Sequence, residues 1–143
     1  MKKTSLVLSF ALAGAIIVGA AASPNLHAQE QQEYISKAKA TPLLKTTLAG
    51  MKGKEVNIVH FAAPPGFVGG KHFHPGHVFV YILEGSLIVK MEGDAPRKLG
   101  PGDVFQEPQD RTMLARNLSS THGVKLLVFQ IGDEGKPLMI KAK

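Results

Sequence analysis

Apolar residues between positions 55 and 131 fall into short runs, which clusters of Gly, Pro, Asp and Glu separate from one another. Runs of roughly four to eight apolar and β-branched residues bounded by turn residues are typical of β-strands. We therefore expect strands at 56–61, 78–83, 87–91, 104–107, 112–116 and 124–131. Their spacing of about ten residues favours an antiparallel sandwich or barrel, so the pattern predicts a single all-β domain.

The run at 78–83 is apolar at every position. A strand with one solvated face would alternate between apolar and polar residues, so we expect both faces of this strand to be covered. The interior of a barrel would cover one face. A second sheet, the N-terminal arm or a partner subunit would cover the other.

The first 28 residues have a different pattern. Two lysines precede a run at 6–22 that is apolar apart from Ser9, and a short polar stretch then leads to Ala28. This is the layout of a secretory signal peptide of bacterial type, which is removed from the mature protein. We expect cleavage after Ala28, with cleavage after Ala22 as the alternative. The other interpretation is an uncleaved membrane anchor, although the run is at the short end of the range that spans a bilayer. Export places the mature protein in the periplasm or outside the cell, without membrane attachment.

Residues 29–54 are polar at first and then contain one apolar cluster within 41–50. Pro42 and the neighbouring threonines disfavour a long helix, so we expect an N-terminal arm with one edge strand that packs on the body of the protein. Residues 55–143 would then form the domain itself, because no internal repeat or low-complexity tract divides them.

Charge and cysteine content narrow the function classes. The chain of 143 residues has 17 basic and 11 acidic residues, which gives a net charge of +6. Removal of the predicted signal peptide takes away two lysines and no acidic residue, which leaves +4. The remaining basic residues are dispersed and form no stripe with interleaved aromatic residues, so nucleic-acid binding is not favoured. The absence of cysteine excludes disulfides, thiolate metal sites and a cysteine nucleophile.

Three histidines lie within six residues, at His72, His74 and His77. Side chains alternate along an extended chain, so His72 and His74 should point to the same side. Two imidazoles in this arrangement can chelate one divalent metal ion, although such pairs are also common as surface or capping residues. The two interpretations stay open on this evidence.

The wider pattern around these histidines resembles the cupin family. It is similar in spacing to the first cupin motif, G-x5-H-x-H-x3-E-x6-G, and to the second, G-x5-P-x-G-x2-H-x3-N. The matching positions are Gly66, His72, His74, Gly85, Gly102, Pro108 and Asn117. The resemblance covers roughly residues 55–131 and extends to small exported single-domain cupins of bacteria. It implies a conical antiparallel β-barrel of the jelly-roll type, a pocket between the two motifs and, commonly, a homodimer.

The resemblance also implies a metal site that two histidines and a glutamate of the first motif share with a histidine of the second. Here Val78 stands at the glutamate position and Met113 at the second-motif histidine position. The site is therefore degenerate, with His72 and His74 as the remaining implied ligands. The metal would be a divalent transition metal such as Fe, Mn, Zn or Cu.

Three residues are candidates to complete such a site. His77 would turn inward only if a bulge interrupts the strand, because plain alternation points it away from His74. Met113 would supply a soft thioether that favours copper, or it would simply fill the pocket. Glu107 would supply an oxygen ligand or a general base, or it would be solvated beside the end of its strand.

The sequence leaves two candidate functions open. In the first, an exported cupin-barrel protein binds a small molecule in a pocket lined by Val78, Met113 and Glu107, with a metal bound weakly or not at all. In the second, the protein is a metal-dependent enzyme, an oxygenase or isomerase of a small organic compound, with Glu107 as the candidate catalytic residue.

Overall fold

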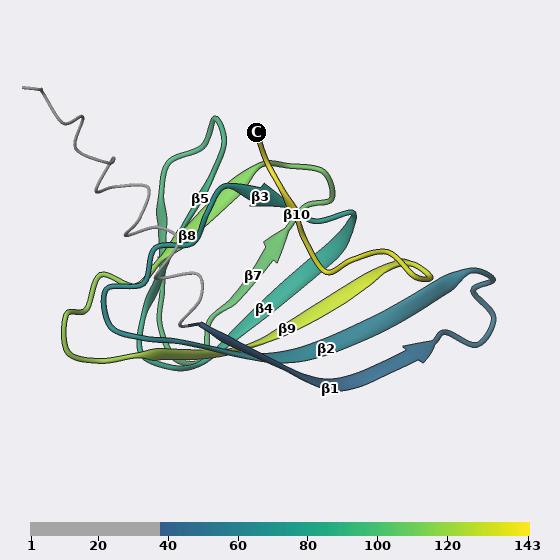
Figure 1. Cartoon of the computed structure of the whole chain (residues 1–143), viewed down its shortest axis with the longest axis horizontal. Coiled ribbons are helices and arrows are strands. Elements are labelled where there is room, and N and C mark those ends of the chain that lie inside the picture. The colour runs from purple at the N-terminus through teal and green to yellow at the C-terminus, as the bar shows by residue number, and fades with distance from the viewer. Residues whose placement is uncertain (1–37) are drawn as a thin grey trace, which may run out of the picture.

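The computed structural model describes residues 38–143, which form ten strands and no helix (Figure 1). The predicted signal peptide and the first residues of the N-terminal arm lie outside the described residues. In chain order the strands are β1 (Lys39–Thr47), β2 (Lys54–Ala63), β3 (His72–Phe73), β4 (Gly76–Glu84), β5 (Leu87–Met91), β6 (Arg97–Leu99), β7 (Val104–Glu107), β8 (Met113–Arg116), β9 (Val124–Asp133) and β10 (Ile140–Lys141). The predicted all-β class is confirmed.

The strands form two antiparallel sheets of five strands each. The first sheet has the order β1-β2-β9-β4-β7, and the second has the order β10-β3-β8-β5-β6. Neighbours in both sheets are mostly distant in the sequence, which is the arrangement of a jelly roll. The first sheet runs along the length of the molecule, and the shorter strands of the second lie opposite its β4 and β7 end (Figure 1).

The apolar runs located six of the ten strands. The observed bounds of β5 and β7 are the expected ones, whereas β2 and β9 extend beyond their apolar runs. The edge strand expected in the N-terminal arm is β1, which pairs with β2 over its whole length apart from a bulge between Pro42 and Leu44. Proline removes one donor from the ladder, and an edge strand tolerates this loss. The strands β3, β6 and β10 were not predicted, because they have two or three residues each and no apolar run.

The space between the two sheets is filled by alternate residues of β4, β5, β8 and β9. In β4, Val78, Val80 and Ile82 are buried in the core, whereas Tyr81 and Leu83 are exposed on the outer face. Met113 belongs to the same core. The polar residues of interest lie at one end of this packed interior, where β4 begins and β7 ends.

Candidate metal and ligand site

His72 and His74 lie side by side at the start of the first motif. His72 is in β3 and His74 follows in the connection to β4, and their rings lie 5.0 Å apart at an angle of 88°. The Nδ1 atom of His72 lies 2.8 Å from the carbonyl oxygen of Gly70, and Nδ1 of His74 lies 2.7 Å from the carbonyl oxygen of Leu138. A carbonyl oxygen only accepts hydrogen bonds, so each Nδ1 is the donor. The lone pair of each neutral ring is therefore on Nε2.

The Nε2 atom of His74 faces the carboxylate of Glu107. The distance from Nε2 to Oε2 is 3.0 Å, and both side chains are 6% exposed. The geometry does not make a hydrogen bond, and Nε2 has no other partner among the described residues. A buried nitrogen lone pair beside a carboxylate is unfavourable unless a proton or a metal ion lies between them.

The register of the first sheet explains why Glu107 reaches this place. Val78 in β4 is the pairing partner of Glu107 in β7 and of Gln130 in β9. Residues directly opposite one another on neighbouring strands point to the same face, so Glu107 and Gln130 flank Val78 on the interior face. The family resemblance expects a carboxylate at Val78, and here the adjacent strand supplies one at the same level.

Gln130 is a site residue that the sequence pattern alone did not reveal. Its side chain is buried, and its amide nitrogen donates to the carbonyl oxygens of Leu138 at 2.9 Å and Pro137 at 3.4 Å. The signal was present in the sequence, because Gln130 has the same parity in β9 as the buried residues Leu126 and Val128. A single polar residue on the buried face of a strand needs a partner, and only the fold identifies that partner.

The structure places Val78 and Met113 in the interior near the site and His77 outside it. Met113 is buried and pairs with His72 across β8 and β3, so its side chain shares the interior face with that ring. Val78 is fully buried beneath the site. His77 is exposed on the outer face of β4, because no bulge interrupts the alternation there. This placement removes His77 from the candidate ligands.

Burial and the neighbouring carboxylate act differently on the two rings. Burial lowers the pKa of His72 below its ordinary value. Burial also acts to lower the pKa of His74, but the Glu107 carboxylate beside Nε2 outweighs it and raises this pKa above the ordinary value. His72 therefore tends to be neutral, whereas His74 holds a proton more readily. A metal ion bound at Nε2 of His74 would have to displace that proton.

The residues fit a transition metal in donor type and in tautomer. Two imidazoles with a free Nε2 and one carboxylate are ligands that Zn, Fe and Mn accept, and the thioether of Met113 adds a ligand for copper. Carbonyl groups that accept from Nδ1 are the usual outer partners of metal-binding histidines. Within residues 38–143, however, no three His, Asp or Glu side chains are already close enough together to hold an ion. His72, His74 and Glu107 are the residues that would hold one.

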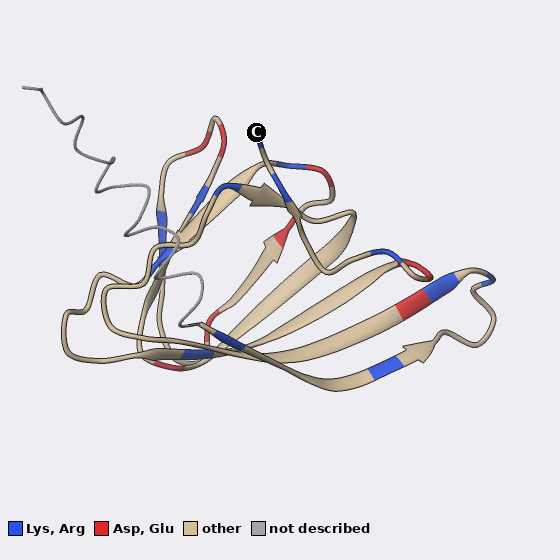
Figure 2. Ribbon diagram, viewed as in Figure 1, with Lys and Arg blue, Asp and Glu red and all other residues tan. Residues whose placement is uncertain are grey.

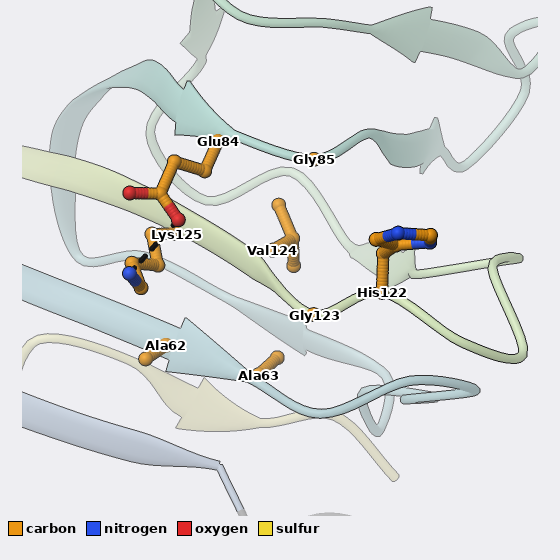
Figure 3. Close-up of a pocket in the computed structure, with 8 residues that line it drawn as sticks. All are labelled: Ala62, Ala63, Glu84, Gly85, His122, Gly123, Val124 and Lys125. Carbon is orange, nitrogen blue, oxygen red and sulfur yellow. Dashed lines mark ion pairs between the residues drawn. The ribbon is translucent and has the colours of Figure 1, made fainter.

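A second feature lies at the opposite end of β4 and β9. It is a hollow of about 400 Å³ lined by Ala62, Ala63, Glu84, Gly85, His122, Gly123, Val124 and Lys125 (Figure 3). Lys125 and Glu84 form an ion pair of 2.8 Å on its wall, and both side chains are about half exposed. None of the predicted site residues lies in this hollow.

A family model described as the cupin domain matches residues 59–129, which include both histidines, Glu107 and Met113. This part of the chain is similar to a cupin domain. Together with the fold, the match supports membership of the cupin superfamily. No protein with a curated functional description matches the sequence.

Solved structures with the same fold include enzymes and proteins without a named activity. The DMSP lyase DddQ from Ruegeria pomeroyi has a TM-score of 0.63 and 23% identity, over 77% of this chain and 54% of the lyase. This chain thus spans about half the length of that lyase. An RmlC-like cupin from Methanocaldococcus jannaschii has a TM-score of 0.57 and 22% identity, over 67% of this chain and 81% of that protein. The protein KdgF from Halomonas has a TM-score of 0.53 and 24% identity, over 66% and 79% of the two chains. At these identities the likeness establishes the fold alone.

Proposed function

We propose that this cupin domain binds a small organic molecule in its interior, beside a transition metal ion held weakly by His72, His74 and Glu107. The observation that carries the proposal is the buried Nε2 of His74, which lies 3.0 Å from the Glu107 carboxylate and has no hydrogen-bond partner within residues 38–143. A buried nitrogen in this position can bind a cation once its proton is displaced, and the Nδ1 contacts of both imidazoles direct Nε2 to that role.

The surroundings favour a small ligand with a polar or anionic group. Met113 pairs with His72 and Val78 pairs with Glu107, and both apolar side chains are buried, so the few polar groups there would orient a ligand. One structure of the same fold is an oxalate oxidase in complex with the substrate analogue glycolate, with a TM-score of 0.57 and 18% identity. That likeness supports small carboxylates as the first class to test.

A bound transition metal would supply Lewis-acid polarisation of a ligand oxygen. The residues of this chain would do the remaining work. His72 and His74 would hold the ion through Nε2, and the buried Glu107 would accept a proton at a carboxylate oxygen that does not bind the ion. This last role favours the second candidate function, a metal-dependent oxygenase or isomerase of a small organic compound.

Metal analysis of untagged protein tests the proposal. Wild-type protein offered iron, manganese, zinc and copper should retain metal after desalting, and the His72→Ala/His74→Ala double variant should lose it. The matched control is His77→Ala/His122→Ala, because both of these histidines are exposed and lie outside the site. A wild-type protein that retains no more metal than the His72→Ala/His74→Ala variant would overturn the metal proposal.

Ligand binding is tested by the melting temperature. Glycolate and related small carboxylates should raise the melting temperature of the wild-type protein and of the control variant, because a ligand that binds only the folded state stabilises it. The His72→Ala/His74→Ala variant should show no such rise. Equal rises in all three proteins would place the binding elsewhere.

We also propose that the protein is a homodimer through the outer face of the first sheet. Cross-strand pairing places six half-buried apolar side chains on this face, from β2, β4 and β9: Val56, Ile58, Phe79, Leu127, Phe129 and Ile131. Lys, Arg, Asp and Glu are absent from most of β4 and β9 and gather toward the strand ends and turns (Figure 2).

The size of this face suits a second copy of the chain. Five strands about 4.8 Å apart and about 25 Å long present roughly 600 Å². Two such faces together reach about 1,200 Å², the lower end of the range for stable interfaces. Light scattering should give a dimer mass that Phe129→Lys reduces to a monomer mass. A monomeric wild-type protein would overturn the dimer. If the dimer is lost when residues 29–37 are deleted, the N-terminal segment rather than the outer face of the first sheet would form the contact.

Export remains a proposal that rests on the sequence pattern of residues 1–28. No helix among residues 38–143 is long and apolar enough to cross a membrane. Mass spectrometry of protein from its native host should show a mature start at Gln29. An intact start at Met1 in the membrane fraction would overturn the proposed export.

A further inference from the structure

The chain after β9 returns across the end of the barrel where the histidines lie. We call residues 134–142 the C-terminal strap. At one end the amide of Glu134 donates to the carbonyl of Gly53, and at the other the amide of Ala142 donates to the carbonyl of Lys71. Between these points β10 pairs with β3, with Lys141 opposite His72. The strap is therefore held at the turn before β2 and along β3, the strand that carries His72 (Figure 1).

The carbonyl of Leu138 is the point where the strap meets the site. This oxygen accepts a hydrogen bond from Nδ1 of His74 at 2.7 Å and another from the amide of Gln130 at 2.9 Å. A carbonyl oxygen has two lone pairs, so both are used. The same oxygen thus joins the strap, the interior of β9 and the histidine that faces Glu107.

Gln130 holds this carbonyl in place from inside the barrel. Its side chain is buried, and its amide also reaches the carbonyl of Pro137 at 3.4 Å. Two consecutive carbonyls of the strap are therefore bound by one buried amide. Without that amide, the strap would keep its ends, and the hydrogen bond from Nδ1 of His74 would be the one remaining bond to the Leu138 carbonyl among the described residues.

We infer that Gln130 is a positioning residue, which acts through the Leu138 carbonyl to direct Nε2 of His74 toward Glu107. The inference rests on the proposed metal function but concerns a property of the metal-free protein as well. A carbonyl that accepts from Nδ1–H fixes both the tautomer and the ring orientation, and loss of such outer partners commonly weakens metal binding about 10- to 100-fold.

The test compares Gln130→Leu with Gln106→Leu. Gln106 is an exposed glutamine on the neighbouring strand β7, so its replacement controls for the change of residue type. In the metal-free protein, long-range ¹⁵N–¹H correlation spectra report the tautomer of His74. At a pH high enough to keep the His74 ring neutral, we expect a single Nδ1–H form in the wild type and in Gln106→Leu, and a mixture of tautomers in Gln130→Leu.

Zinc titration provides the second readout. Gln130→Leu should bind Zn²⁺ about 10- to 100-fold more weakly than the wild type, whereas Gln106→Leu should bind it equally well. A Gln130→Leu protein that melts at a lower temperature but keeps the tautomer and the zinc affinity would show that Gln130 is only structural, and would overturn the inference. If Gln130→Leu does not fold, Gln130→Asn provides the test, because its shorter side chain cannot span the same distance.

The two proposals fail in different ways. A wild-type protein that binds no zinc contradicts the proposed metal function, while the tautomer of His74 in Gln130→Leu still decides the role of Gln130. A wild-type protein that binds zinc, with an unchanged tautomer in Gln130→Leu, contradicts only the positioning role.

Discussion

The two ends of β4 and β9 each hold a glutamate beside a cationic or titratable side chain, yet they differ in their surroundings. At one end Glu107 faces His74 at 3.0 Å, with both side chains 6% exposed. At the other end Glu84 faces Lys125 at 2.8 Å, with exposures of 61% and 49%. The distances are alike, and the exposure to water is not.

The two pairs therefore differ in how much they contribute to stability, and burial rather than distance sets this contribution. Water screens the exposed pair, which contributes little to stability. The buried pair has no solvent to replace either partner, so removal of one leaves the other uncompensated. A proton or a metal ion therefore matters at the first end and not at the second.

The largest expected effect comes from removing the two glutamates in turn. Glu107→Ala in metal-free protein should lower the free energy of unfolding by about 3 kcal/mol, because it leaves His74 buried without its partner. Glu84→Ala should lower it by less than about 1 kcal/mol. Urea denaturation in the presence of a chelator measures both values. Equal losses would contradict the expected effect of burial.

The second effect concerns the backbone beside the exposed pair. Gly85 has φ +74°, and a Cβ atom there would lie only 2.3 Å from the carbonyl oxygen of Gly123. Gly85→Ala should therefore lower the free energy of unfolding by about 2–3 kcal/mol. Gly102 has φ +88° with no atom within 4 Å of such a Cβ, so Gly102→Ala should cost only about 1 kcal/mol. Equal costs would show that the close backbone contact is not rigid.

The third effect concerns the Met113 thioether at the buried end. Met113→Leu conserves volume and removes the sulfur, so it should lower the affinity for copper about tenfold and leave the affinity for zinc unchanged. Competition titrations with both metals measure this selectivity. An unchanged copper affinity would exclude the thioether as a ligand.

The smallest effect concerns a third glutamate. Burial acts to raise the pKa of Glu55, but hydrogen bonds from Lys45, Asn57 and the backbone of Gly135 outweigh it, so its pKa lies below the ordinary value. The unfolded chain then binds the proton more readily, and stability is lost as the pH falls through the lowered pKa. Glu55→Gln should flatten the decline of stability between about pH 6 and pH 3. Denaturant midpoints measured across this range would contradict the expectation if both proteins decline equally.

The sequence located most strands but not all of them. Short runs bounded by Gly, Pro or Asp marked β5 and β7 at their observed ends, because local pattern carries this information. The strand β6 begins with Arg97 and Lys98, and β3 and β10 contain two residues each, so no local pattern identified them. Their pairing partners, and not their own residues, make them strands.

The sequence likewise predicted the histidine pair of the candidate site but not the contacts that this pair makes. The spacing of His72 and His74 placed both rings on one side of the chain, and their rings lie 5.0 Å apart. The contact between His74 and Glu107 depends on the register that sets Val78 opposite Glu107. The role of Gln130 depends on the return of the C-terminal strap. A local sequence pattern shows neither the register between distant strands nor the position of the C-terminal strap.

The sequence by itself determined the all-β class, the apolar run that forms β4 and the pairing of two histidines within one motif. These properties depend on residues that are neighbours along the chain, where side-chain direction follows from backbone geometry. The tertiary structure alone decided which groups meet these histidines. Glu107 and the carbonyl of Leu138 reach His74 from strands and segments more than thirty residues away, because pairing between distant strands sets their position.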